Sequence, residues 1–162
     1  MSAIINSVTL AEIPALLELI RELAQFERLE HELEATPESL RESLFGPHPV
    51  AGALFARDNE ALAGYAIYFF TFSSFTGRKG LWLDDVYVRP QFRHRGIGPR
   101  LIGAVAQIGA DNNCSRFEWT ALNWNQTDLD VYRKSGATVM SDWVLLRLNN
   151  EGLKKLAASK RA

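Results

Sequence analysis

The sequence predicts a single domain of the α/β class, in which one mixed β-sheet carries helices on its faces. Apolar residues recur at helical spacing in residues 11–27 and 99–112, whereas residues 51–57 and 61–72 are apolar runs that flank a short turn. The predicted order along the chain is strand, two helices, three strands, helix, strand, helix, strand. No repeat or internal linker divides the sequence, and 162 residues suffice for one sizeable core, so residues 1–162 are expected to form one domain.

The first third of the chain is predicted to contain one strand and two helices. Residues 4–9 are read as a short strand, and residues 11–27 as an amphipathic helix with Pro14 in its first turn. Thr36 is expected to cap a second, shorter helix, which a loop at residues 45–50 follows.

The remaining residues are predicted to supply the other strands and a third and fourth helix. The expected strands are residues 51–57, 61–72, 81–88, 116–122 and 138–149, and the expected helices are residues 99–112 and 127–135. Asp58 and Asn59 mark the turn between the first two of these strands, and Gly136 is expected to end the fourth helix. The tail after residue 150 is read as a short helix that frays.

Composition argues against several classes of function. The net charge of −1 gives no general attraction to nucleic acid or membrane, and no apolar run is long enough to span a bilayer. The chain starts without a signal-peptide pattern and has one cysteine, so a reducing cytoplasm is expected. That residue, Cys114, is read as a buried hydrophobe rather than a catalytic thiol. His31, His48 and His94 are not spaced as metal ligands, and no metal is expected.

Charge is distributed unevenly along the chain. Residues 12–42 carry nine glutamates against three arginines, whereas residues 78–100 carry six basic residues against two aspartates. Two regions of opposite sign indicate two ligands of opposite charge. Glutamates that only keep helices solvated would produce the same acidic stretch, so that alternative stays open.

A basic loop with two glycines, residues 93–98, joins the strand at 81–88 to the helix at 99–112. Glycines allow the backbone N–H groups to converge, the helix N-terminus adds positive potential, and arginines add full charge. The loop is neither a P-loop nor a dinucleotide fingerprint, because the residues that complete those motifs are missing. A tight turn without a ligand is the alternative to a site for a phosphorylated molecule.

The loop and the strand before it resemble the acetyl-CoA motif of the GNAT N-acetyltransferases. The resemblance rests first on Arg93, Gly96 and Gly98 with their spacing after residues 86–88. Further stretches are similar to the branch that contains diamine and thialysine acetyltransferases, namely residues 22–30, 45–49, 68–72, 83–88, 123–137 and 142–148. The resemblance implies the GNAT fold, a homodimer, and acetyl-CoA as the co-substrate.

The resemblance also implies which residues hold acetyl-CoA. The backbone of Val86, Tyr87 and Val88 would bind the pantetheine arm as a peptide binds to a strand edge. The pyrophosphate would be bound by the loop residues Arg93, His94, Arg95, Gly96, Ile97, Gly98 and Pro99. Asn125 would complete this site at the start of the next helix, and a plain helix cap is its other reading.

Two residues are expected to carry the chemistry. Tyr132 matches the tyrosine that protonates the departing CoA thiolate, a role that suits a phenol placed at the sulfur; a core tyrosine is the alternative. Asp84 matches the position of a glutamate that acts as base or substrate anchor, and its shorter side chain favours a bridging water. Strict alternation would place Asp84 on one face with Trp82, Val86 and Val88, and Asp85 on the other. An ion pair or a loop tether is favoured for Asp85.

The expected substrate-binding residues are Phe26, Glu27, Asp84 and Trp119. Phe26 and Glu27 match a Tyr-Glu pair that contacts a polyamine, although Glu27 could also be one solvated charge among many. Ser73 stands where the spermidine-type enzymes carry an acid, which favours a shorter amine. The four tryptophans, Trp119 included, are otherwise read as core or interface residues rather than a nucleic-acid platform.

Together these patterns predict an N-acetyltransferase that moves acetyl from acetyl-CoA to the primary amine of a small cationic substrate by direct attack. Its substrate would be a diamine, a polyamine or a thialysine-like amino acid. Two alternatives remain at this stage. One is acetylation of an amino acid or a protein amine, and the other is an inactive CoA-binding regulatory module.

Overall fold

The computed structural model describes residues 3–159, the side chain of Asp128 excepted. The chain divides into two compact units, residues 1–122 and residues 123–162. Among these residues the first unit contains the sheet and three α-helices, and the second contains two α-helices joined by a segment without regular secondary structure.

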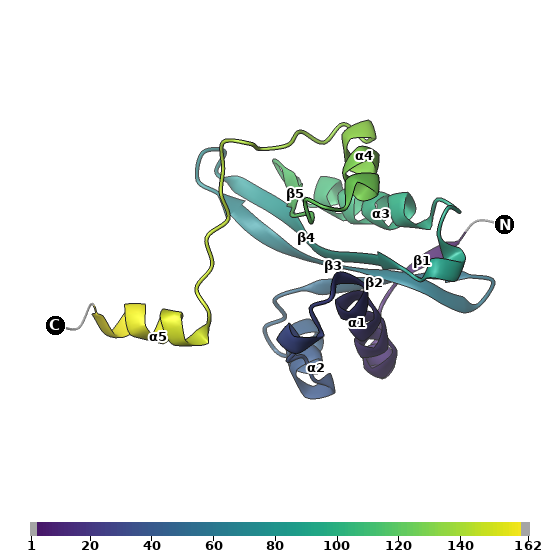
Figure 1. Cartoon of the computed structure of the whole chain (residues 1–162), viewed down its shortest axis with the longest axis horizontal. Coiled ribbons are helices and arrows are strands. Elements are labelled where there is room, and N and C mark those ends of the chain that lie inside the picture. Colours follow the sequence, from purple (N-terminus) through teal and green to yellow (C-terminus); the bar gives the residue numbers. More distant parts are fainter. Residues whose placement is uncertain (1–2, 160–162) are drawn as a thin grey trace. The chain divides into compact units, whose positions relative to one another are not determined.

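One five-stranded sheet forms the centre of the first unit (Figure 1). Its strands are β1 (Ile4–Ser7), β2 (Gly52–Asp58), β3 (Ala61–Ser73), β4 (Arg78–Val88) and β5 (Phe117–Trp119), and they lie side by side in chain order. The pairs from β1 to β4 are antiparallel, and β5 runs parallel to β4. The expected mixed sheet is thus confirmed for the described residues of this unit.

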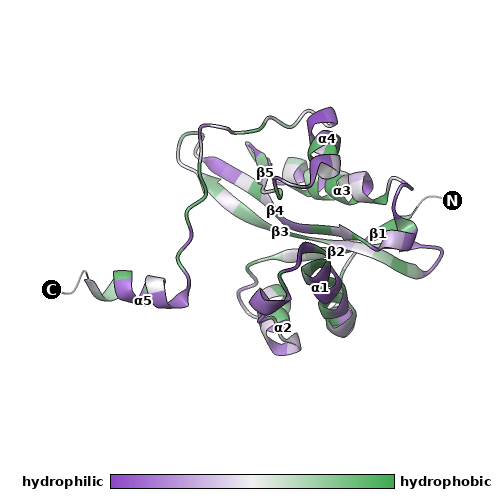
Figure 2. Cartoon of the chain, viewed as in Figure 1, coloured by the Kyte–Doolittle hydropathy of each residue, from purple (hydrophilic) through white to green (hydrophobic). Residues whose placement is uncertain are grey.

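Helices cover both faces of the sheet. In Figure 1, α1 (Ile13–Glu27) and α2 (Pro37–Phe45) lie on one side, and α3 (Ile97–Asp111) lies on the other. Along each of these helices hydrophobic and hydrophilic residues are interspersed, as a one-sided contact requires (Figure 2). The central strands are buried on both faces, so their sequences are nearly continuous apolar runs.

Two hydrophobic clusters result, one for each face. Leu101 and Val105 of α3 pack with Leu54 of β2 in the first cluster. Leu16 and Leu19 of α1 belong to the second cluster, which includes Phe55. Leu54 and Phe55 are neighbours in the chain, so the alternation of a strand divides them between the faces.

Local signals in the sequence match these elements closely. The backbone N–H of Ser39 donates to the Thr36 hydroxyl at 3.1 Å, and the Thr36 N–H donates to the Ser39 hydroxyl at 2.9 Å, so the expected cap of α2 is reciprocal. Gly136 has φ +94°, the left-handed conformation expected after a helix end. Cys114 is half-buried and packs against the α3 cluster, so the side chain is partly covered.

The prediction of a strand at residues 138–149 is wrong. No strand occurs among these residues, and α4 (Gln126–Lys134) and α5 (Asn150–Ser159) flank them. The pattern of apolar residues is that of a strand, but a strand also needs a partner edge for its N–H and C=O groups. The second unit supplies no such edge within its described residues. The strand expected at 116–122 is confirmed only over residues 117–119.

Among the described residues, the structure contains no helix whose length and apolar character would let it cross a membrane.

Candidate active site

The loop between β4 and α3 has the backbone of an anion site. After β4 the chain makes a single 3-10 turn at residues 90–92, and α3 begins at residue 97. His94 and Gly96 both adopt left-handed conformations, with φ of +62° and +75°. Arg100 donates the first helical N–H bond, to the Gly96 carbonyl at 3.2 Å. The N–H groups that precede Arg100 in this turn have no intrahelical acceptor, and they can therefore bind an anion.

The glycines of this loop leave space for a ligand. A Cβ atom built on Gly96 would meet nothing within 4 Å, and one built on Gly98 would meet only Val88 Cγ2, at 3.8 Å. A phosphate group can therefore approach the backbone closely. This backbone is open to an anion, as the expected pyrophosphate site requires, and the assignment of residues 93–99 to acetyl-CoA stays a prediction.

The two arginines of the loop contact the protein itself. Arg93 Nε donates to the Val88 carbonyl at 2.9 Å, and its guanidinium lies 4.6 Å from the centre of the Phe26 ring. Arg95 forms an ion pair with Asp58 at 2.8 Å and lies over the Phe92 ring. Their charges raise the local potential beside the backbone N–H groups of the loop.

A β-bulge in β4 sets the positions of the two strand aspartates. Tyr68 of β3 pairs with Leu83, and Ile67 pairs with Asp85, so Asp84 is an extra residue in the ladder. The bulge reverses the alternation: Val86 and Val88 pack in the α3 cluster together with Leu81 and Leu83, residues of the other parity. The expectation that Val86 and Val88 share a face with Trp82 is therefore wrong.

Asp85 is the half-buried carboxyl of the site. The Tyr65 hydroxyl donates to Asp85 Oδ2 at 3.0 Å, and this contact replaces the ion pair or tether that the sequence favoured. Burial, then the neighbouring charge of Asp84, raises the pKa of Asp85 from 3.8 to about 6; the Tyr65 hydrogen bond opposes the rise and the charge of Glu27 adds to it. Burial also raises the pKa of Tyr65 well above its usual value.

The structure brings several of the expected site residues together. Glu27 lies at the end of α1, where burial raises its pKa. The charge of Glu27 contributes to the raised pKa of Asp85. Phe26 lies beside it, under the guanidinium of Arg93. A carboxyl cluster of Glu27, Asp84 and Asp85 thus lies in the part of the first unit where β4 leads into the anion loop.

Other expected residues have positions that leave their roles open. Trp119 lies on β5, where its ring centre is 5.0 Å from that of Phe117 at a tilted angle of 54° and the side chain packs against the α3 cluster. Asn125 and Tyr132 belong to the second unit. The Asn125 carbonyl accepts from the Leu129 N–H at 3.1 Å, so Asn125 precedes the first turn of α4 as a helix cap does. Tyr132 lies in that helix.

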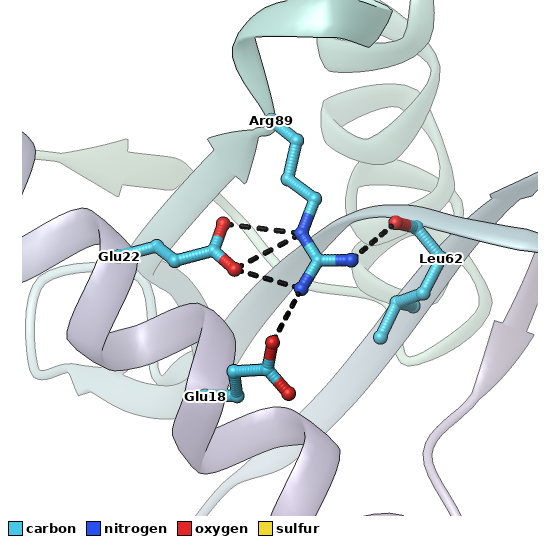
Figure 3. A network of polar contacts seen from close by, with 4 residues as sticks. All are labelled: Glu18, Glu22, Leu62 and Arg89. Carbon is cyan, nitrogen blue, oxygen red and sulfur yellow. Dashed lines mark hydrogen bonds and ion pairs between the residues drawn. The ribbon is translucent and has the colours of Figure 1, made fainter.

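The sequence reasoning missed an arginine that holds the site together. Arg89, directly after β4, contacts two glutamates of α1 and a backbone carbonyl of β3 (Figure 3). Two signals were available: Glu18 and Glu22 are four residues apart on a predicted helix, and Arg89 directly precedes a proline at a strand end.

Within the described residues, no three His, Cys, Asp or Glu side chains are grouped as metal ligands.

Comparisons with known proteins agree with this geometry. The model of the Acetyltransferase (GNAT) family matches residues 14–137. A thialysine N-epsilon-acetyltransferase of Sus scrofa is 34% identical over 153 residues, which cover 88% of this chain and 89% of that protein. The spermidine/spermine N(1)-acetyltransferase-like protein 1 of Homo sapiens is 33% identical over 89% of this chain and 22% of its own length. A solved integron cassette protein of V. cholerae has a TM-score of 0.80 and 27% identity, with 97% of this chain and 98% of that chain covered.

Proposed function

The chain belongs to the GNAT acetyltransferase family, and we propose that its substrate is a small cationic amine: a diamine, a polyamine or a thialysine-like amino acid. It is an acetyl-CoA-dependent N-acetyltransferase that acts on amines, as the family match and the identity with thialysine acetyltransferases establish.

The observation that carries the substrate proposal is the carboxyl cluster beside the anion loop. Glu27, Asp84 and Asp85 lie near enough that the first two raise the pKa of the third. A concentration of negative charge attracts an ammonium group and holds it by charge-assisted hydrogen bonds. A substrate with a second positive charge gains more from three carboxyls than a neutral amine does.

The binding of acetyl-CoA is assigned to the loop and the adjoining strand. The N–H groups of residues 94–98 and the N-terminus of α3 would hold the pyrophosphate, and the backbone of Val86, Tyr87 and Val88 would hold the pantetheine arm. Acetyl-CoA supplies a thioester, whose carbonyl carbon bonds to the amine nitrogen as its bond to sulfur breaks. Because both substrates are held together, attack becomes effectively unimolecular.

The amine arrives protonated and must lose a proton to attack. Asp85 is assigned as the group that accepts it, because a carboxyl with a pKa near 6 is a stronger base than an ordinary aspartate at neutral pH. Asp84, which is exposed, is assigned as the anchor of the ammonium. Tyr132 would donate its phenolic proton to the departing thiolate sulfur.

Two further proposals concern the whole protein. We place the enzyme in the cytoplasm, in agreement with its single cysteine. We also propose a homodimer, which the exposed apolar side chains of residues 139–148 support.

A screen of amines tests the proposed substrate. Purified protein and acetyl-CoA are mixed with spermidine, thialysine, lysine, short diamines and a lysine-containing peptide, and the released thiol is followed. Highest kcat/KM with one of the small dications supports the proposal. Turnover with the peptide alone would assign a protein amine as substrate, and CoA binding without thiol release from any amine would indicate a regulatory module.

A further inference from the structure

Arg89 connects the acetyl-CoA loop to helix α1 through an unusually complete set of contacts. Its Nε and Nη2 donate to the carboxylate of Glu22 at 2.7–3.1 Å, and Nη2 also donates to Glu18 at 3.0 Å. Its Nη1 donates to the Leu62 carbonyl at 3.1 Å, so all three nitrogens of the guanidinium are used (Figure 3). A bidentate arginine–carboxylate pair fixes orientation as well as distance.

A second arginine, Arg93 in the loop itself, contacts the same side of α1. Glu18, Glu22 and Phe26 are spaced four residues apart, so they form one stripe along the helix. Arg89 contacts the first two, and the guanidinium of Arg93 lies on the ring of the third. Glu27, a member of the carboxyl cluster, directly follows Phe26.

The position of Arg89 in the chain makes these contacts consequential. Arg89 is the first residue after β4, and its own N–H donates to the Ala63 carbonyl at 2.9 Å. Four residues later the loop with the left-handed His94 and Gly96 begins. The Arg89 side chain is 20% exposed and that of Glu22 is 27% exposed, so water screens this pair less than a surface pair.

We propose that Arg89 is a positioning residue that couples the acetyl-CoA loop to the amine-binding end of α1, so that ordering of one orders the other. The proposal rests on the assignment of Phe26 and Glu27 to the amine site. Coupling of this kind is reciprocal: acetyl-CoA favours the α1 conformation that binds the amine, and the amine favours the loop conformation that binds acetyl-CoA.

Hydrogen exchange with CoA as the probe tests the coupling without an amine. In the wild type, saturating CoA should slow amide exchange both in residues 93–100 and in residues 22–28. In Arg89→Met, CoA should still slow amide exchange in the loop. In residues 22–28 the slowing by CoA should fall from about five-fold in the wild type to less than two-fold in the variant. A five-fold effect lies at the lower end of typical allosteric coupling. Since Met leaves Glu22 without its partner, the double variant E22Q/R89M removes that unpaired charge and should behave in the same way.

Arg57→Met is the matched control. Arg57 of β2 forms an ion pair of similar exposure with Glu12, at the opposite end of α1. This variant should lose stability but keep the effect of CoA on residues 22–28. Equal protection of α1 in R89M and the wild type, or no protection in the wild type, would overturn the proposal. The amine screen is a separate experiment, so a wrong substrate assignment can be distinguished from a failure of the coupling proposal.

Discussion

Asp85 is a residue whose burial makes the stability of the fold depend on pH. Its pKa rises from 3.8 to about 6 on folding, because the ionised form loses hydration and faces other carboxylates. Below about pH 4 both the folded and the unfolded chain carry the proton. Between about 4 and 6 the unfolded chain has lost the proton while the folded chain retains it, so stability declines as pH rises through this window. Two pKa units correspond to roughly 3 kcal/mol.

Asp85→Asn should therefore stabilise the fold at neutral pH while lowering activity. The amide keeps an oxygen that can accept from Tyr65, and it never ionises. Urea unfolding at several pH values should show the variant gaining about 2–3 kcal/mol over the wild type between pH 4 and pH 7. Tyr65→Phe is a second variant for the same test. The hydrogen bond from Tyr65 lowers the pKa of Asp85, so its loss should raise that pKa and extend the pH range of declining stability to higher pH. A wild-type and D85N difference that does not change with pH would contradict the burial of a titrating Asp85.

Tyr132 is the second residue with a sharp chemical expectation. Tyr132→Phe removes only the phenolic oxygen, so helix α4 should keep its packing. As general acid–base groups typically contribute, kcat should fall by about 10²–10⁴-fold, while the affinity for CoA measured by calorimetry should change less than about two-fold. Turnover at the wild-type rate would show that another group protonates the thiolate sulfur. Loss of CoA affinity with unchanged kcat would instead assign Tyr132 to binding.

At the scale of elements, the turn into α3 depends on one backbone conformation. Gly96 has φ +75°, which a residue with a Cβ adopts only at a cost of about 1 kcal/mol. Gly96→Ala should therefore lose that stability and, by shifting the N–H groups of the loop, weaken CoA binding about ten-fold. CoA binding by calorimetry and thermal unfolding measure the two effects.

Two other glycines serve as controls for Gly96. Gly77 in the β3–β4 turn has φ +64° and the same open surroundings, so Gly77→Ala should lose similar stability but bind CoA normally. Gly103 lies within α3 with nothing within 4 Å of a built Cβ, so Gly103→Ala should stabilise the helix by up to about 1 kcal/mol. Equal CoA affinity in G96A and G77A would contradict a backbone anion site at this loop.

The elements also show which parts of the site the sequence could predict. Periodicity, Thr36 and Gly136 are local signals, and the helices they predict begin and end within about two residues of the expected positions. The bulge at Asp84 is not a local signal, because it depends on how β4 pairs with β3. Strict alternation therefore assigned the wrong neighbours to Val86 and Val88, and it missed the hydrogen bond that Asp85 accepts from Tyr65. Arg89 was missed because its partners lie about 70 residues earlier in the chain, at Glu18 and Glu22.

At the scale of the whole molecule, the segment between α4 and α5 has the apolar pattern of a strand, but its apolar side chains are exposed. Apolar side chains of this segment are more than half exposed, namely Val139, Met140, Trp143, Val144, Leu145, Leu146 and Leu148. The residues of this segment follow a pattern typical of strands, which is why the sequence predicted a strand there. Apolar area in water is unfavourable by roughly 25 cal/mol per Å², so a cover for this segment would stabilise the protein. A second copy of the chain is the cover that a homodimer provides.

The homodimer proposal predicts how charge in this segment changes the mass in solution. Light scattering after gel filtration should give about twice the 18.2 kDa chain mass for the wild type at micromolar concentration. The double variant V144E/L146E should elute as a monomer, because two carboxylates would have to lose their hydration inside the interface. Phe75→Glu introduces the same charge at a side chain that is 99% exposed in the β3–β4 turn, and it should remain dimeric. Thermal unfolding shows whether each variant is folded. A monomeric wild type, or a folded V144E/L146E variant that still dimerises, would contradict the assignment of residues 139–148 to the interface.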